Sequence, residues 1–88
     1  MAWRIEFHPD AVQDISKLDR PIQKRIIGYL KERIAKAGDP RSFGKALTGK
    51  KKDLWRYRVG DYWIICDVRS QVLLVLVVKV GHRSNVYY

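Results

Sequence analysis

Hydrophobic and polar residues alternate at the start of the chain, as they do along a half-buried β-strand. Over residues 2–8, Trp3, Ile5 and Phe7 share one face and the polar residues share the other. Two stretches with helical spacing follow, and Asp19 can cap the second of them. The apolar positions of these stretches are Ala11, Val12, Ile15 and Leu18, then Ile22, Ile26, Ile27, Leu30 and Ile34. The pattern therefore predicts one strand and then two amphipathic helices.

The second half of the chain returns to the two-residue period of β-strands. Residues 54–59 and 62–68 are predicted strands, joined by a tight turn in which Gly60 comes first. Glycine at this position favours a type II′ turn. After a further turn, residues 72–80 are apolar on both faces. Such a run is typical of a central strand that is covered on both sides.

The order of these elements predicts an α+β fold within a single domain spanning residues 1–88. Residues 38–53 are rich in glycine and lysine and predict an irregular connector between the helices and the later strands. We expect an N-terminal strand, a two-helix hairpin and a three-stranded antiparallel meander. The strands would form a curved antiparallel sheet with the helices packed on one face.

The two-residue turn also fixes which residues lie opposite one another in the hairpin. Counting outward from the turn puts Arg58 opposite Trp63 and Arg56 opposite Ile65, on one face. The other face holds the residues expected to pack on the helices, which are Trp55, Tyr57, Val59, Tyr62, Ile64 and Cys66. The hairpin therefore presents arginines and an indole together on the side of the sheet away from the core.

The chain is strongly basic, with 18 lysines and arginines against 9 acidic residues and a net charge of +9. This charge exceeds what solubility requires and predicts a polyanionic or acidic partner. The basic residues beyond the hairpin are Lys45, Lys50, Lys51 and Lys52 in the connector and Lys24, Arg25, Lys31 and Arg33 on the second helix. Basic side chains mixed with exposed aromatics suit a phosphate backbone with unstacked bases. Nucleic-acid contact is therefore favoured, and the residues alone leave catalysis open.

Other candidate chemistry is sparse. His82 is a candidate general acid or base, because histidine titrates near neutral pH, although such a residue is more often an ordinary polar group. Cys66 is the only cysteine and reads as a core residue, in keeping with a reducing cytoplasm. The spacing of cysteine and histidine suggests no metal site, and no cofactor motif is visible. No apolar run is long enough to cross a membrane.

The chain resembles the RelE family of toxin–antitoxin toxins over essentially its whole length. The resemblance is carried by IEFHPDAVQDISKLDRPIQKRI, by LWRYRVGDYWIICDV and by VLVVKVGHRSNVY, in that order. The most specific pieces are W-R-Y-R-V-G-D-Y and G-H-R-x-x-V-Y. The resemblance implies a compact microbial-ribonuclease-like fold. It also implies metal-free endoribonuclease activity on mRNA in the ribosomal A site, which blocks translation.

In that family the ribose 2′-oxygen attacks the adjacent phosphate, leaving a 2′,3′-cyclic phosphate and a 5′-hydroxyl. The resemblance implies that Arg56 and Arg58 stand at positions of two family lysines. It places Arg83 and Tyr87 at the positions of a family arginine and a C-terminal tyrosine, and Trp63 where an arginine is expected. Arginine is a poor proton acceptor, and an indole cannot neutralise charge on phosphorus. The sequence therefore predicts attenuated cleavage and gives His82 added interest.

The resemblance implies a cognate antitoxin as partner, acidic and folding on binding, together with the ribosomal A site and mRNA. Operator DNA would be contacted only through the antitoxin complex. Two alternatives stay open. One is a toxin of the related ParE branch, which shares the fold, acts on DNA gyrase and lacks the ribonuclease residues; Arg83 in the G-H-R-x-x-V-Y tail favours RelE, whereas Trp63 keeps the ParE alternative open. The other is a non-catalytic module that binds the antitoxin and represses its own operon.

Overall fold

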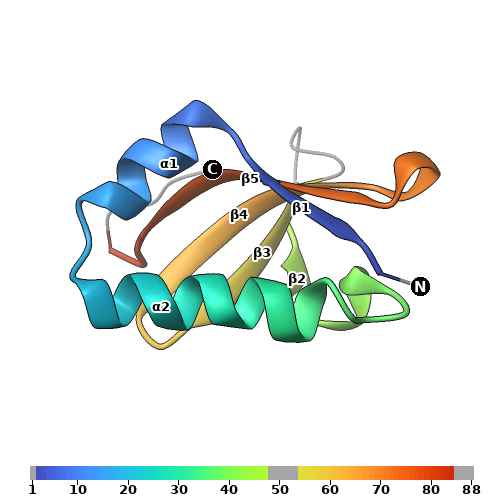
Figure 1. The fold of residues 1–88 in the computed structure, drawn as a ribbon. Helices are drawn as coiled ribbons and strands as arrows, with labels where there is room; N and C mark the ends of the chain where they lie inside the picture. The colour runs from blue at the N-terminus through green and yellow to red at the C-terminus, as the bar shows by residue number, and fades with distance from the viewer. Residues whose placement is uncertain (1, 48–53, 85–88) are drawn as a thin grey trace.

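The computed structural model describes residues 2–47 and 54–84 of the chain (Figure 1). The strands are β1 (Arg4–Phe7), β2 (Lys45–Ala46), β3 (Leu54–Val59), β4 (Tyr62–Arg69) and β5 (Leu74–His82). The helices are α1 (Pro9–Ser16) and α2 (Arg20–Tyr29), which a π-helical turn at Leu30–Ile34 continues, and 3₁₀ turns occupy Pro40–Ser42 and Ser70–Val72. The predicted α+β class and the predicted element order are confirmed.

The strands form one five-stranded sheet in the order β1-β5-β4-β3-β2. The sheet is mixed, because β1 runs parallel to β5 while the other neighbours are antiparallel. The expectation of a wholly antiparallel sheet is therefore wrong at this strand pair. Alternation along residues 2–8 identifies a strand but says nothing about the direction of its partner. The predicted central position of the last strand is confirmed, since β5 lies between β1 and β4.

Part of the predicted irregular connector is ordered. Pro40–Ser42 form a 3₁₀ turn, and β2 adds a two-residue strand at the edge of the sheet. In β2, Lys45 lies opposite Arg56 of β3. A strand of this length is too short to show a period in the sequence, so it could not be predicted.

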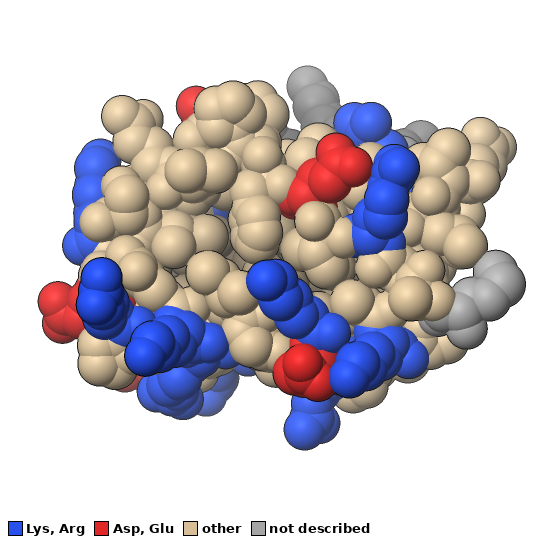
Figure 2. All heavy atoms as spheres, viewed as in Figure 1, with Lys and Arg blue, Asp and Glu red and all other residues tan. Residues whose placement is uncertain are grey.

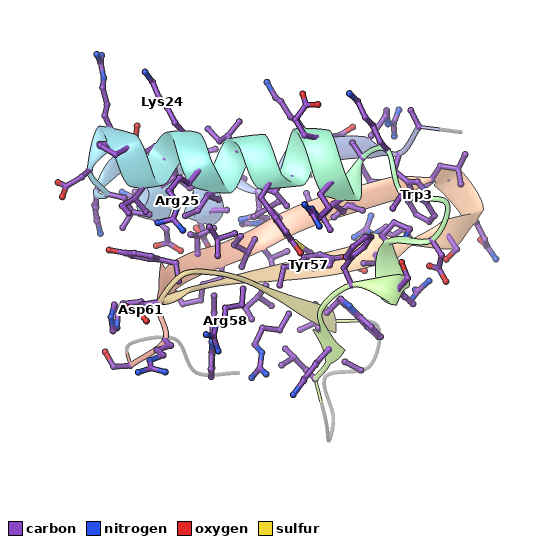
Figure 3. The ribbon with its side chains drawn as sticks, turned by 90° about the horizontal axis from the view of Figure 1, so that it is seen from below. Trp3, Lys24, Arg25, Tyr57, Arg58 and Asp61 are labelled. Atoms are coloured by element: carbon purple, nitrogen blue, oxygen red, sulfur yellow. The ribbon has the colours of Figure 1, made fainter. Side chains whose placement is uncertain are left out.

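Both helices cover the same face of the sheet, as expected (Figure 1). The core between the layers is apolar, and the predicted inward face of the hairpin contributes Tyr57, Ile64 and Cys66, none of which is exposed. Figure 3 shows Tyr57 between α2 and the sheet. Its hydroxyl donates a hydrogen bond of 2.8 Å to the buried carbonyl of Pro40. This bond ties the 3₁₀ turn before β2 to the middle of β3.

Replacing Tyr57 with phenylalanine should lower the free energy of unfolding by about 1–3 kcal/mol, because the buried Pro40 carbonyl loses its donor. The ring would keep its packing, so the loss comes from the hydrogen bond. Chemical denaturation checks the size of the effect. A Tyr29→Phe variant is the control, since the Tyr29 ring packs edge to face on Tyr57, with centroids 6.1 Å apart, and its hydroxyl makes no hydrogen bond among the described contacts. Equal losses in both variants would contradict this account.

The hairpin register agrees with the prediction at every pair. Arg58 lies opposite Trp63, Arg56 opposite Ile65, and Val59 opposite Tyr62. Gly60 has a φ of 60°. Asp61 is not among the described residues with positive φ, which fits type II′ rather than type I′, because type I′ needs positive φ at both positions. A short turn with one permitted register thus positions the arginines as the sequence indicates.

A β-bulge interrupts β5 and changes which residues face the helices. Cys66 pairs with Val77 whereas Ile65 pairs with Lys79, so Val78 is the extra residue. β1 pairs with β5 only as far as Val77, and none of the strands in the described part of the chain pairs with this edge of β5 beyond that point. There the carboxylate of Asp14, on α1, accepts a hydrogen bond of 3.1 Å from the Val80 amide. An aspartate side chain thus takes the place of a neighbouring strand at this edge.

None of the described helices has the length and apolar character needed to span a bilayer.

Candidate functional site

Arg56, Arg58 and Trp63 lie together on the outer face of the β3–β4 hairpin, away from the helices, and we call this group the arginine face. Lys45 of β2 extends it, because it pairs directly with Arg56. The face is not a simple solvated surface, since Ile65, beside Arg56, is only 1% exposed. The sequence-predicted grouping is therefore present, with Lys45 as a neighbour that the period of the sequence could not place.

Trp63 is stacked with a guanidinium, although with a different arginine from the one directly opposite it. The Arg56 guanidinium carbon lies 4.3 Å from the centroid of the indole ring. This is a diagonal pair across the two strands, and it gives a cation–π contact. The contact orients the Arg56 guanidinium and offsets part of the repulsion expected between Arg56 and Arg58. It makes Trp63 a structural partner of the basic residues and not simply a missing charge.

Further arginines converge on the Gly60–Asp61 turn. The Arg58 Nε donates a hydrogen bond of 3.1 Å to the Gly60 carbonyl. The backbone amide of Arg83, which follows β5, donates one of 2.9 Å to the Asp61 carbonyl. Arg25 comes from α2, and its guanidinium atoms begin 3.5 Å from where a Cβ on Gly60 would lie. Figure 3 shows Arg25 on the sheet side of α2 and Arg58 on the opposite side of the sheet.

The predicted basic surface of α2 is partly confirmed. Lys24, Lys31 and Arg33 are exposed, and Figure 2 shows basic side chains gathered along this helix. Lys24 points away from the sheet in Figure 3. Arg25 differs from the expectation of a purely outward residue, because its guanidinium approaches the hairpin turn. Its position in a helical wheel gave no signal of this, since a long side chain can reach beyond its own face.

His82 is not brought together with the arginine face. It pairs with Tyr62, and the two rings meet edge to face with centroids 5.7 Å apart. Tyr62 packs against the hydrophobic core, on the helix side of the sheet. The adjacent pair, Trp63 with Gly81, lies on the outer face. The sheet therefore separates the imidazole from the residues beside which a general acid or base was expected.

Other predicted site residues fall outside the described part of the chain. These are Lys50, Lys51 and Lys52 of the connector and Tyr87 near the C-terminus. Within the described ranges, Cys66 is buried and has the core role expected of it. Burial raises the pKa of the Cys66 thiol and, likewise, the pKa of the Tyr57 hydroxyl. Both groups are therefore protonated at neutral pH and are unsuited to attack a substrate.

Gly44 allows the strand that carries Lys45 to pack against β3. It has a φ of 71°, and a Cβ built on it would lie 2.3 Å from the backbone oxygen of Arg56. The indole Nε1 of Trp55 donates a hydrogen bond to the nearby Phe43 carbonyl. Because the closest atom belongs to the backbone, a side chain here cannot be relieved by a rotamer change.

Replacing Gly44 with alanine should lower the free energy of unfolding by about 2–5 kcal/mol, from the left-handed backbone and the forced displacement of β3. Gly28→Ala is the matched control. It lies within α2 with nothing within 4 Å of the added Cβ, and it should stabilise by about 0.5–1 kcal/mol. Denaturant unfolding of both variants checks the pair. A Gly44→Ala variant as stable as the parent would show that the backbone at residue 44 is not held close against β3.

The fold is similar to that of solved toxin structures. Against the RelBE2 toxin–antitoxin complex from Mycobacterium tuberculosis, the TM-score is 0.86 at 20% identity, covering 97% of this chain and 95% of that one. Against the isolated RelE toxin of E. coli, it is 0.73 at 18% identity, covering 92% and 84%. Against the archaeal RelE–RelB complex from Pyrococcus horikoshii, it is 0.71 at 23% identity, covering 98% and 100%.

No curated protein sequence matches the chain significantly. The family model described as the ParE toxin of type II toxin–antitoxin systems matches residues 5–87, and so includes the hairpin, β5 and the G-H-R-x-x-V-Y stretch. Together with the structural likeness to RelE toxins, this match confirms the resemblance found in the sequence at the level of the RelE/ParE superfamily. By this match across nearly its full length, the chain belongs to the ParE toxin family of type II toxin–antitoxin systems.

Proposed function

We propose that this toxin is a metal-independent endoribonuclease that cleaves mRNA in the A site of the ribosome, with the arginine face against the RNA. The single observation that carries the proposal is the stack of Arg56 on Trp63 directly beside Arg58. Fixed guanidinium groups suit phosphate oxygens, and an indole suits an unstacked base. The combination matches single-stranded RNA better than duplex DNA, because stacking on a side chain requires a base that is free of its neighbours.

The reaction exchanges one oxygen atom bonded to phosphorus for another. The ribose 2′-oxygen bonds to the phosphorus and the bond to the 5′-oxygen breaks. The 2′-hydroxyl gives up its proton, and the leaving 5′-oxygen gains one. Negative charge grows on the phosphoryl oxygens in between, and donors fixed near them lower the barrier. We assign this stabilisation to Arg58 and Arg83, which approach the same turn, and base stacking to Trp63.

The remaining members of the site follow from the resemblance to RelE toxins. Tyr87 is proposed as a further contact to the scissile phosphate, and Lys45 as a contact to a neighbouring one. Sequence-independent contacts to ribosomal RNA are proposed for Lys50, Lys51 and Lys52, for Lys24 on α2, and for Lys31 and Arg33 on the π-helical turn that continues it. His82 is left out of the catalytic group, because its ring lies on the helix side of the sheet.

The partners are proposed on two grounds. The solved relatives from Mycobacterium tuberculosis and Pyrococcus horikoshii are complexes of a toxin with its antitoxin. The net charge of +9 favours an acidic partner segment that folds on binding. We therefore propose an acidic cognate antitoxin, with operator DNA contacted through the toxin–antitoxin complex.

A gyrase-inhibiting activity is the second candidate, and two observations favour it. The matching family model is described as a ParE toxin, and Trp63 occupies a position where an RNA-cleaving relative is expected to carry arginine. An indole stacked on Arg56 would then serve a protein contact and not a base.

One experiment with two arms separates the candidates. Primer extension on translated mRNA, with and without ribosomes, should reveal new 5′ ends only when ribosomes are present. A supercoiling assay with DNA gyrase should show no inhibition at the same toxin concentration. Cleavage that does not need ribosomes would contradict the A-site proposal. Gyrase inhibition without new 5′ ends would establish the second candidate in its place.

A further inference from the structure

A pocket lies at the edge of the sheet, where β5 extends past β1 and lies beside the end of α1. Its volume is about 280 Å³. Its walls come from the end of α1, the first residue of β4 and the last residues of β5. The side chains that carry charge or hydrogen-bonding groups there are Asp14, Lys17, Tyr62, Lys79 and His82, and Leu18 and Val80 add apolar surface. Lys79 pairs with Ile65, so its side chain leaves the sheet on the outer face, and its ammonium comes within 3.9 Å of Asp14 at the edge of β5.

The hydrogen bonds made by His82 Nδ1 leave the other ring nitrogen, Nε2, as a hydrogen-bond donor. Its Nδ1 accepts a hydrogen bond of 3.2 Å from the backbone amide of Ser84. A backbone amide can only donate, so Nδ1 carries no proton in this arrangement and the neutral ring is protonated at Nε2. The Ser84 hydroxyl lies 2.8 Å from the same Nδ1. The edge-to-face contact with Tyr62 fixes the plane of the ring. The imidazole therefore offers one oriented N–H group.

The charges that line the pocket leave an excess of one positive charge. Lys17 and Lys79 contribute two ammonium groups, and Asp14 contributes one carboxylate. The Asp14 carboxylate is already engaged, because its Oδ2 accepts the hydrogen bond from the Val80 amide. Its separation from the Lys79 Nζ is 3.9 Å, at the limit of an ion pair. The Lys79 ammonium is thus only loosely neutralised and keeps donors for a further oxygen ligand.

The pocket fits a monoanion better than a more highly charged group. An excess of one positive charge is neutralised by one carboxylate, whereas a phosphate monoester would bring a second negative charge close to Asp14. A bound RNA strand is not favoured as the source, because Tyr62, Val80 and His82 line the pocket from the helix side of the sheet, whereas the arginine face lies on the other side. Leu18 and Val80 give the methylene groups of an acidic side chain an apolar surface to contact.

From this geometry we propose that the pocket between α1 and the part of β5 that extends past β1 binds the carboxylate of one glutamate or aspartate side chain carried by an acidic protein partner. Lys17 and Lys79 supply the charge, and His82 Nε2–H supplies a directed hydrogen bond. The proposal rests on the acidic antitoxin proposed above and is independent of RNA cleavage. It gives His82 a recognition role in place of a catalytic one.

The test is a titration of the isotope-labelled full chain, followed by NMR. The probe is an acetylated and amidated alanine-rich peptide that carries one glutamate. It should cause saturable shifts of the Leu18, Gly81 and His82 amides, which surround the pocket. The same peptide with glutamine should cause none, because it lacks the charge. The Lys79→Met variant should bind the glutamate peptide about three- to fivefold more weakly, as expected for one exposed charge pair.

Lys24→Met is the matched control, since it removes the same charge from the side of α2 that faces away from the sheet and should leave the titration unchanged (Figure 3). His82→Gln should also weaken binding, while its unfolding transition reports whether the fold is kept. Equal shifts with the glutamine peptide would overturn the proposal. So would equal losses in the Lys79 and Lys24 variants, or tighter saturation of the same amides by inorganic phosphate or an oligouridylate. Primer extension is a separate readout, so its failure would not be mistaken for failure here.

Discussion

Replacing Arg58 with glutamine is expected to slow single-turnover cleavage of mRNA on programmed ribosomes by about 10²–10³-fold, the loss typical of one charge-stabilising donor. Arg58 is exposed on the arginine face, and only its Nε is hydrogen-bonded, to the Gly60 carbonyl at 3.1 Å, among the described contacts. Under the proposed function, the terminal guanidinium nitrogens would therefore be the groups that contact the scissile phosphate. The rate is measured at saturating ribosome concentration, so that weaker binding does not contribute.

Arg58→Lys is the matched control, because it keeps the charge and shortens the donor. It should retain activity within about tenfold, since a lysine binds phosphate as a point charge. The free energy of unfolding should change little in either variant, because the side chain is exposed. A glutamine variant that cleaves at the parental rate would remove Arg58 from the catalytic group. Arg83 would then be the remaining arginine proposed to stabilise the charge on the phosphoryl oxygens.

The hairpin could be predicted residue by residue because its register depends on local chemistry alone. A turn of two residues with Gly60 first permits one pairing, and that pairing puts Arg58 opposite Trp63. The division into a core face and an arginine face follows from the two-residue period. Both inferences can be made without information on where the helices or the other strands lie.

The face of the sheet on which His82 lies could not be predicted in this way, because a β-bulge earlier in β5 shifts the alternation of side chains between the two faces. Val77 faces the core, and strict alternation from it would put residue 82 on the outer face, beside the arginines. The extra residue at Val78 reverses the alternation, so Val80 and His82 face the helices instead. The apolar run of residues 72–80 hides this shift, since it offers no polar residue to mark a face.

The partner strand of β1 and the rotamers of the arginines could not be predicted from the sequence either. The alternation of β1 identifies a strand, yet its parallel pairing with β5 depends on how the two helices return the chain to the sheet. The register puts Arg58 opposite Trp63, whereas the guanidinium over the indole belongs to Arg56. Backbone pairing sets which Cβ atoms are neighbours, and the rotamers of a long side chain then select among them.

Trp63→Arg is expected to raise single-turnover cleavage by about 10²-fold, since it adds a donor where negative charge grows in the transition state. The new guanidinium would lie between Arg58 on β3 and Gly81 on β5, both of which pair with position 63. Gly81 has no side chain to obstruct it. The substitution also removes the indole that stacks on Arg56, so that guanidinium becomes free to turn toward the phosphate.

The cost in stability should be small. The contact is half-buried, and a cation–π contact at an accessible site contributes about 0.5–1 kcal/mol; Trp63 also lies outside the core cluster of the described residues. Trp63→Leu is the control that separates the two effects, because it removes the stack without adding charge and should not raise cleavage. Equal cleavage by the parent and by Trp63→Arg would mean that the indole is a working part of the site, with base stacking in place of charge. If the leucine variant also cleaves faster than the parent, the low cleavage rate of the parent is due to the stack of Trp63 on Arg56, since only the loss of that contact is common to both variants.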